Sequence, residues 1–290
     1  MGSILNLTKY PIDQPNSSQS IDFMQTAHDT FHRDGIVVVP GFMFSDIAAE
    51  IVEELLSEFD RNSMCEIDAD HNIYEFTHPD PFYPATHPRN AEVHTKFHPL
   101  PIDDIPRSSI LHRVYDWDVM TRFISSIVNG QVSNPPLLHH FDDPLSSLSV
   151  NVLFDEDILN WHFDQAPFTA VILLQNAIEG GEYVVAPESL LVDGRYDYDL
   201  HGKVIYELEN KTQSYTFNPG DLFIHRGSHS LHRLTTVFGD RPRMSAALQY
   251  ARTPRERLSD LNRRSVYCRT EPLKYCQPEK SSEFAMMCTD

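Results

Sequence analysis

Positive charge is scarce in this chain. Its 290 residues include 23 Lys and Arg against 42 Asp and Glu, a formal net charge of −19. A surface of that sign repels a phosphate backbone and an anionic membrane, so we expect neither nucleic acid nor a membrane as a partner. Apolar runs such as 169–174 are also far shorter than the roughly 20 residues of a membrane span.

Cysteine is sparse as well, with four residues at positions 65, 268, 276 and 288. That number is too small for a disulfide framework, and the spacings lack the close pairs of a structural zinc site. Residues 1–15 lack the basic segment and the apolar core of a secretory signal. We therefore expect reduced cysteines and a cytoplasmic protein.

Apolar residues make up 41% of the chain and charged residues 22%, close to the globular average, so a sizeable core is expected. No internal repeat or linker divides the sequence, which predicts one domain over 1–290. Its expected parts are an irregular arm at 1–20, helical support with a cover loop at 21–130, a core at 145–252, and a C-terminal helix and tail at 253–290, with the helix at 253–264.

Helical periodicity dominates the first part of the chain. Apolar spacing predicts a helix at 21–33, a second with Ser45 as its N-cap, and a third at 116–128, with a buried strand at 36–39. Residues 60–109 hold prolines and histidines without a sustained period, so we expect a long loop that covers a cleft.

From residue 148 onward, short strands follow one another, separated by turn residues. The sequence predicts strands at 148–154, 168–174, 182–186, 203–208, 213–217, 222–225 and 244–250. Because these strands are grouped behind helices rather than alternating with them, we expect an all-β core. The predicted fold is a double-stranded β-helix, or jelly roll, supported by N-terminal helices.

One His-x-Asp motif carries metal-binding chemistry. In an extended backbone residues i and i+2 project to one face, so the imidazole of His162 and the carboxylate of Asp164 point together. A second imidazole, that of His232, follows 70 residues later, with His225 and His229 as alternatives. Two histidines and one carboxylate on one side of a metal are the donor set of non-haem Fe(II) oxygenases.

An arginine completes the set of charged groups. Arg243 opens the predicted strand 244–250, eleven residues after His232. A guanidinium there can bind a carboxylate through two parallel hydrogen bonds, and a buried guanidinium requires such an anion. Arg241 lies on the same face of that strand and is an alternative anchor.

This ordered set resembles the pattern of the Fe(II)/2-oxoglutarate-dependent dioxygenase superfamily, which is a His-x-Asp, a distal His and then an Arg. Residues 31–42, 173–182 and 218–223 also look like its entry strand, the hairpin after the metal motif and the turn before the distal histidine. The segment 143–164 is most similar to a branch of amino-acid hydroxylases and radical halogenases.

The resemblance implies an enzyme with three cofactors or co-substrates: Fe(II), 2-oxoglutarate and O2. His162, Asp164 and His232 would hold the iron, and Arg243 and Gln175 would bind 2-oxoglutarate. The reaction would decarboxylate 2-oxoglutarate to succinate and oxidise a C–H bond of a small molecule, such as an amino acid or a secondary metabolite. Hydroxylation is the default outcome, and desaturation or cyclisation would share its chemistry.

Two departures and two alternatives qualify this interpretation. Halogenases of the branch replace the metal-binding Asp with a small residue, so Asp164 disfavours halogenation. Leu159 stands where lysine-type members carry a substrate-contacting His, which argues against a free basic amino acid.

Candidates for the substrate pocket are Asn151, Trp161 and Gln249. The alternatives are a cupin-like metal-dependent isomerase or hydrolase, and a non-enzymatic jelly-roll binding module.

Overall fold

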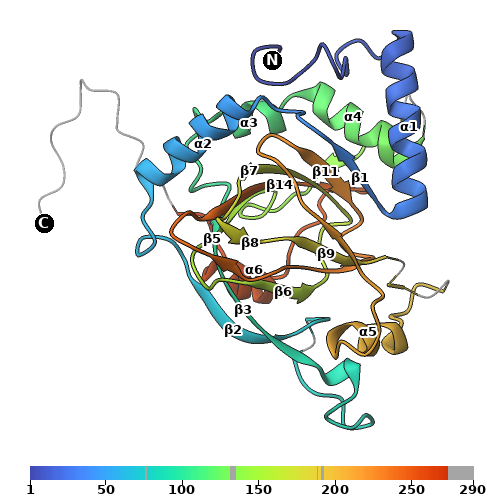
Figure 1. Cartoon of the computed structure of the whole chain (residues 1–290), viewed down its shortest axis with the longest axis vertical. Helices are drawn as coiled ribbons and strands as arrows, with labels where there is room; N and C mark the ends of the chain where they lie inside the picture. The colour runs from blue at the N-terminus through green and yellow to red at the C-terminus, as the bar shows by residue number, and fades with distance from the viewer. Residues whose placement is uncertain (76, 131–134, 188, 191–192, 274–290) are drawn as a thin grey trace, which may run out of the picture.

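The computed structural model describes residues 1–273 except 76, 131–134, 188 and 191–192, and shows antiparallel sheets beneath a layer of helices (Figure 1). The helices are α1 (Ser18–Asp34), α2 (Ser45–Glu58), α3 (Ile110–Tyr115), α4 (Asp118–Asn129), α5 (Tyr198–Ile205), α6 (Asp260–Tyr267) and the short 3-10 helix η1 (Pro88–Asn90). The strands are β1 (Ile36–Val39), β2 (Ile67–Asn72), β3 (Glu92–Pro101), β4 (His139–His140), β5 (Leu148–Leu153), β6 (Leu159–His162), β7 (Phe168–Gln175), β8 (Glu179–Gly180), β9 (Tyr183–Ala186), β10 (Gln213–Tyr215), β11 (Leu222–His225), β12 (Leu231–Leu234), β13 (Val237–Phe238) and β14 (Arg243–Ala251).

The strands form two facing sheets. The larger runs in the order β1-β11-β7-β14-β5-β3-β2, with β4 paired to β14, and the smaller in the order β10-β9-β12-β6. Strands β8 and β13 make a short pair of their own. This arrangement is the double-stranded β-helix that the sequence predicted, and the prediction of the fold class is confirmed.

The central strands of the larger sheet are buried on both faces, and the two faces pack against different partners. On the outer face, Phe31 of α1, Leu55 of α2 and Phe123 of α4 share one buried cluster with strand residues such as Ile172. On the inner face, neighbouring residues such as Val171 pack against the smaller sheet. Alternate residues of a strand point to opposite faces, and β1 and most of β7 are accordingly continuous apolar runs.

Most elements of the first third were predicted. The helix at 21–33 and the strand at 36–39 are confirmed as α1 and β1, and the helix near Ser45 is α2. Phe44 rather than Ser45 is the N-cap of α2, and it makes no side-chain capping bond. The expected helix at 116–128 is α4, which the separate short helix α3 precedes.

The expected loop at 60–109 is wrong, because this segment contains β2 and the ten-residue strand β3. Strand β3 pairs with β5 from His98 to Pro101 and so belongs to the larger sheet. The sequence analysis did not predict β3 because the segment contains prolines, and proline is a poor strand residue. They are tolerated because β2 pairs with β3 only as far as Phe97, and beyond that point β2 needs no N–H from β3.

Two further elements differ from the sequence prediction. The predicted strand at 203–208 is wrong, because helix α5 extends to Ile205. The N-cap of this helix is Asp197, which accepts a hydrogen bond from the N–H of Leu200. The predicted helix at 253–264 begins only at Asp260, after its N-cap Ser259. Residues 274–290 lie outside the described part of the chain.

A disulfide joins Cys65 to Cys268 and corrects the expectation of reduced cysteines. It connects the segment before β2 with the end of α6, and the two residues are 203 positions apart in the chain. The sequence argument for a reducing compartment therefore no longer holds. Within the described residues, no helix combines the length and the apolar character that a membrane crossing requires.

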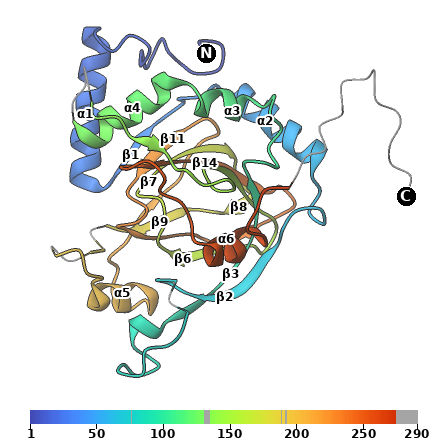
Figure 2. The ribbon, with the colours of Figure 1, turned by 180° about the vertical axis from the view of Figure 1, so that it is seen from behind.

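Helix α6 packs against β2 and β3 (Figure 2). A buried ion pair anchors this helix. The Nε of Arg263 donates to Asp143 at 2.9 Å, and both side chains are buried. Backbone N–H groups also donate to the same carboxylate, from Leu145, Ser146 and Leu258. Asp143 thus ties α6 to the loop before β5.

We predict that Asp143→Ala lowers the free energy of unfolding by about 3–5 kcal/mol, because the guanidinium of Arg263 loses its buried partner and keeps only the exposed carboxylate of Asp260. Urea denaturation measures this change. The neighbouring exposed Asp142 is the control, and Asp142→Ala should change the free energy by less than about 0.5 kcal/mol. Equal effects of the two substitutions would contradict the anchoring role.

Candidate metal centre and co-substrate site

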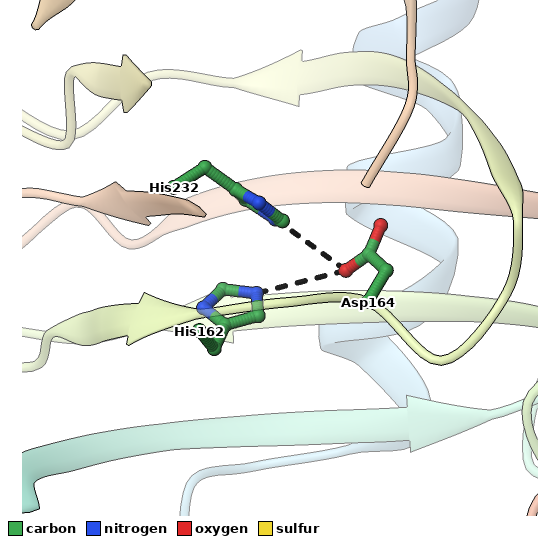
Figure 3. Close-up of side chains that lie close together, drawn as sticks. All are labelled: His162, Asp164 and His232. Atoms are coloured by element: carbon green, nitrogen blue, oxygen red, sulfur yellow. Dashed lines mark ion pairs between the residues drawn. The ribbon is translucent and has the colours of Figure 1, made fainter. Parts of the chain in front are cut away.

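The structure brings the predicted ligands His162, Asp164 and His232 together at the end of β6 and on β12 (Figure 3). One ligand atom from each residue lies within 4.8 Å of the others. The Oδ1 atom of Asp164 is 3.7 Å from Nε2 of His162 and 3.4 Å from Nε2 of His232. Three donor atoms therefore converge on one point, as a facial metal site requires.

Strand pairing places the two imidazoles side by side. His162 of β6 and His232 of β12 are direct cross-strand partners, and the register shifts between this pair and the pair of Leu159 with Leu234. Side chains of such partners lie on the same face of the sheet, and here the ring centroids are 4.2 Å apart. The short β6 thus positions one histidine against its partner and then releases the chain toward Asp164.

Hydrogen bonds fix the orientation of both rings. The Nδ1 of His162 donates to the carbonyl of Asn160 at 2.6 Å, and the Nδ1 of His232 donates to the carbonyl of Ser230 at 2.8 Å. In each case the acceptor lies two residues earlier in the chain. With the proton on Nδ1, each Nε2 has a free lone pair for a metal.

The carboxylate of Asp164 is held in its charged form. Burial alone would raise the pKa of Asp164, but the imidazoles of His232 and His162 outweigh burial and lower the pKa well below its usual value. An ionised carboxylate is the form in which Asp164 binds a metal.

Arg243 lies in the same cavity and is fully buried. Its Nε donates to the carbonyl of Gly181 at 2.9 Å and its Nη1 to the hydroxyl of Ser245 at 3.0 Å. None of the ion pairs among the described residues includes Arg243, and burial lowers its pKa to about 10. A guanidinium that is desolvated in this way attracts an anion into the cavity.

The alternative anchor, Arg241, lies outside the cavity. Its exposed side chain donates to the carbonyls of Asn176 and Ala177. The structure thus places Arg243, and not Arg241, beside the predicted ligands.

The cavity between the two sheets has a volume of about 350 Å³. Lining side chains from the larger sheet include Thr95 and Phe97 of β3, Ser149 and Asn151 of β5, Thr169 and Val171 of β7, Phe223 and His225 of β11, and Arg243, Ser245, Ala247 and Gln249 of β14. In each strand they are alternate residues, because every second side chain points inward. Polar groups on several strands therefore converge on one interior space.

The sequence model of the family described as Halogenase D matches residues 88–264, which is more than half of the chain. The chain belongs to the Halogenase D family. It is accordingly an oxidoreductase of the Fe(II)/2-oxoglutarate-dependent oxygenase superfamily, and the resemblance seen in the sequence is confirmed. A search of curated proteins gave no significant match.

Solved structures share the fold at low identity. The α-ketoglutarate-dependent epimerase SnoN from nogalamycin biosynthesis has a TM-score of 0.52 and 16% identity, over 79% of this chain and 83% of that one. The carbocyclase SnoK from the same biosynthesis has 0.51 and 16%, over 86% and 92%. A prolyl hydroxylase from Trichoplax adhaerens has 0.51 and 12%, over 82% and 95%. Similarity at this level shows the fold alone.

In this Halogenase D family member, two of the predicted site residues lie away from the cavity. Gln175 does not line the cavity. Its side-chain amide instead donates to the carbonyl of Pro242 at 2.8 Å. Trp161 is also absent from the lining and packs in a separate cluster, with the guanidinium of Arg233 over its ring. Trp161 precedes His162 in the same strand and so points to the opposite face.

The other two pocket candidates do line the cavity. Asn151 projects from β5 and Gln249 from β14. The Oε1 of Gln249 is buried and has no hydrogen-bond partner within the described part of the chain. A buried acceptor left free in a cavity can accept a hydrogen bond from a ligand.

The structure also decides between the histidine alternatives. His229 lies outside the lining, and its Nδ1 contacts the hydroxyl of Ser228. His225 lines the cavity but lies behind Asp164, with Nε2 3.4 Å from Oδ2. Burial lowers the pKa of His225 to about 3, so the ring is neutral. Among the described residues, His232 is the distal histidine of the cluster of three.

Sequence reasoning missed Glu75, which lies in the segment expected to be a loop. Glu75 lines the cavity and has a left-handed backbone conformation, with φ of 59°. Its Oε2 accepts hydrogen bonds from the side-chain amides of Gln165 and Asn262. Burial raises the pKa of Glu75 to about 7. Its only sequence signal is an acidic residue between aromatic ones, which is too common to be informative.

Because the pKa of Glu75 is raised on folding, its stabilising contribution should be present below about pH 4.5 and lost as the pH rises through about 7. We predict that, as the pH rises across this range, the free energy of unfolding of the metal-free wild type falls by about 1–3 kcal/mol relative to that of Glu75→Gln. Urea denaturation at several pH values measures the difference. Glu92 is exposed, so Glu92→Gln is the control. If the difference in free energy of unfolding between wild type and Glu75→Gln is as independent of pH as that between wild type and Glu92→Gln, the burial of Glu75 is contradicted.

Proposed function

We propose that this protein is an Fe(II)/2-oxoglutarate-dependent oxygenase that hydroxylates a C–H bond of a small molecule. The observation that carries the proposal is the convergence of His162, Asp164 and His232 beside a buried, unpaired Arg243. The donor set suits ferrous iron, and the guanidinium suits a dicarboxylate co-substrate. Membership of the Halogenase D family supports the same class of reaction.

In this proposal each side chain has a defined role. His162 and His232 would bind Fe(II) through Nε2, and Asp164 through Oδ1. Bound iron would supply the activation of O2, coupled to decarboxylation of 2-oxoglutarate to succinate. The protein contributes a fixed geometry and a cavity lined in part by apolar side chains such as Phe97 and Phe223, which disfavour water.

Arg243 would bind the distal carboxylate of 2-oxoglutarate. The bonds from Arg243 to Gly181 and Ser245 hold the guanidinium at one end of the cavity without neutralising its charge. The co-substrate would thereby be oriented with its keto-acid end toward the metal ligands. The sequence analysis also assigned Gln175 to the co-substrate. In this proposal Arg243 binds it without Gln175, because the amide of Gln175 already donates to a backbone carbonyl.

The retained carboxylate favours hydroxylation over halogenation. Asp164 places an oxygen between the two imidazoles, where it would occupy a coordination position. A halide would need that position to be empty. Despite the name of the family, we therefore propose that the product carries a hydroxyl group rather than a halogen.

The substrate would occupy the part of the cavity that contains Glu75, Asn151 and Gln249. None of the ion pairs among the described residues includes Glu75, although its side chain is half-buried. A buried carboxylate gains most from a basic partner. We therefore propose a small amino acid or secondary metabolite that carries an amine, with Asn151 and Gln249 as hydrogen-bonding groups.

Mixing the protein anaerobically with Fe(II) and 2-oxoglutarate should give the weak visible charge-transfer band of the chelate. We predict that Asp164→Ala and His232→Ala abolish the band. Arg243→Ala should instead raise the 2-oxoglutarate concentration required for half-formation by about 30-fold or more, because the carboxylate loses its charged partner. Arg241→Ala is the matched control and should behave as wild type. Absence of the band in wild type would contradict the proposed function.

A second prediction concerns chloride. In a screen of amine-containing metabolites for substrate-dependent succinate release, the rate should be the same with and without chloride, and mass spectrometry should show addition of one oxygen atom. Chloride does not compete because Asp164 already fills the position that a halide requires. A chlorinated product from wild type would contradict the assignment as a hydroxylase.

A further inference from the structure

A buried group of side chains surrounds the oxygen of Asp164 that does not face the metal ligands. While Oδ1 is directed to the two imidazoles, Oδ2 accepts a hydrogen bond from the hydroxyl of Thr169 at 2.7 Å. The Nε2 of His225 lies 3.4 Å from the same oxygen. The two oxygens of one carboxylate therefore have different surroundings.

His225 is itself held from behind. The hydroxyl of Tyr183 lies 3.0 Å from Nδ1 of His225, and both residues are buried. When the phenol donates to Nδ1, the imidazole proton is on Nε2, and His225 presents an N–H to Oδ2 of Asp164. Thr169 and His225 would then both donate to the same oxygen.

The strand register makes this arrangement rigid. Thr169 of β7 and His225 of β11 are direct cross-strand partners. The backbone N–H of Asp164 donates to the carbonyl of Gly227 at 3.0 Å, and a Cβ at Gly227 would overlap Oδ2. Glycine is thus required there by close packing against the carboxylate, which has little room to rotate.

We propose that Thr169 and His225 are positioning residues that hold Oδ2 of Asp164 away from the metal and present Oδ1 alone. A carboxylate that binds through one oxygen leaves the remaining coordination positions free for the co-substrate. The inference rests on the proposed function only in that it requires a metal at His162, Asp164 and His232. It adds two residues whose proposed role is exerted through Asp164.

Titration of the metal-free full-length protein with Co(II), followed by its visible absorption, tests this role without turnover. Thr169→Val and His225→Leu remove one donor each and should weaken Co(II) binding by about 10- to 100-fold, with a changed spectrum. Thr169→Ser and His225→Gln keep a donor and should restore affinity and spectrum. Thr169→Val preserves the shape of the side chain, so the test does not depend on the His225 variants.

The matched control is His201, a second buried histidine whose Nδ1 lies 2.8 Å from a tyrosine hydroxyl, that of Tyr74. His201→Gln should leave Co(II) affinity unchanged even if thermal unfolding shows a loss of stability. Wild-type affinity and spectrum in Thr169→Val and His225→Leu, beside loss of binding in Asp164→Ala, would overturn the positioning role alone. Failure of wild type to bind Co(II) at all would contradict the proposed metal centre, and the positioning role with it.

Discussion

The cross-strand pairing of His162 with His232 is the interaction on which the rest of the site depends. It unites two segments that are 70 residues apart, and β6 ends at His162, two residues before Asp164. The smaller sheet therefore supplies both imidazoles, and the turn after β6 supplies the carboxylate. A change of register in either strand would separate the three donor atoms, because one residue of slip reverses the direction of every side chain.

The larger sheet supplies the opposite wall of the cavity and the charge that a co-substrate requires. Arg243 is buried at the start of β14, where water cannot stabilise its charge and no carboxylate among the described residues pairs with it. Glu75 is a half-buried acidic group in the same cavity, and burial raises its pKa to about 7. Arg243 therefore favours an anionic group of a ligand, and Glu75 favours a cationic one. The predicted metal ligands line the same cavity. Helices α1, α2 and α4 contribute by burying the outer face of this sheet, which keeps its strands in place.

Local patterns in the sequence were sufficient for the fold class and for selecting the three side chains that cluster as candidate metal ligands. The alternation that sends His162 and Asp164 to one side, and the order of His232 and Arg243 after them, are features of short segments. The role of β3 could not be predicted, because its prolines resemble loop residues and only the limited reach of β2 makes them acceptable. Gln175 and Trp161 were misassigned because the direction of a side chain depends on partners far away in the sequence. Glu75 was missed for the same reason, since Gln165 and Asn262 reach it from distant segments.

The most direct test of the account is a crystal structure of the anaerobic complex with Fe(II) and 2-oxoglutarate. The account predicts one metal ion bound by Nε2 of His162, Nε2 of His232 and a single oxygen of Asp164, with the distal carboxylate of 2-oxoglutarate on Arg243. A metal ion bound elsewhere, or a co-substrate carboxylate that does not reach Arg243, would contradict it.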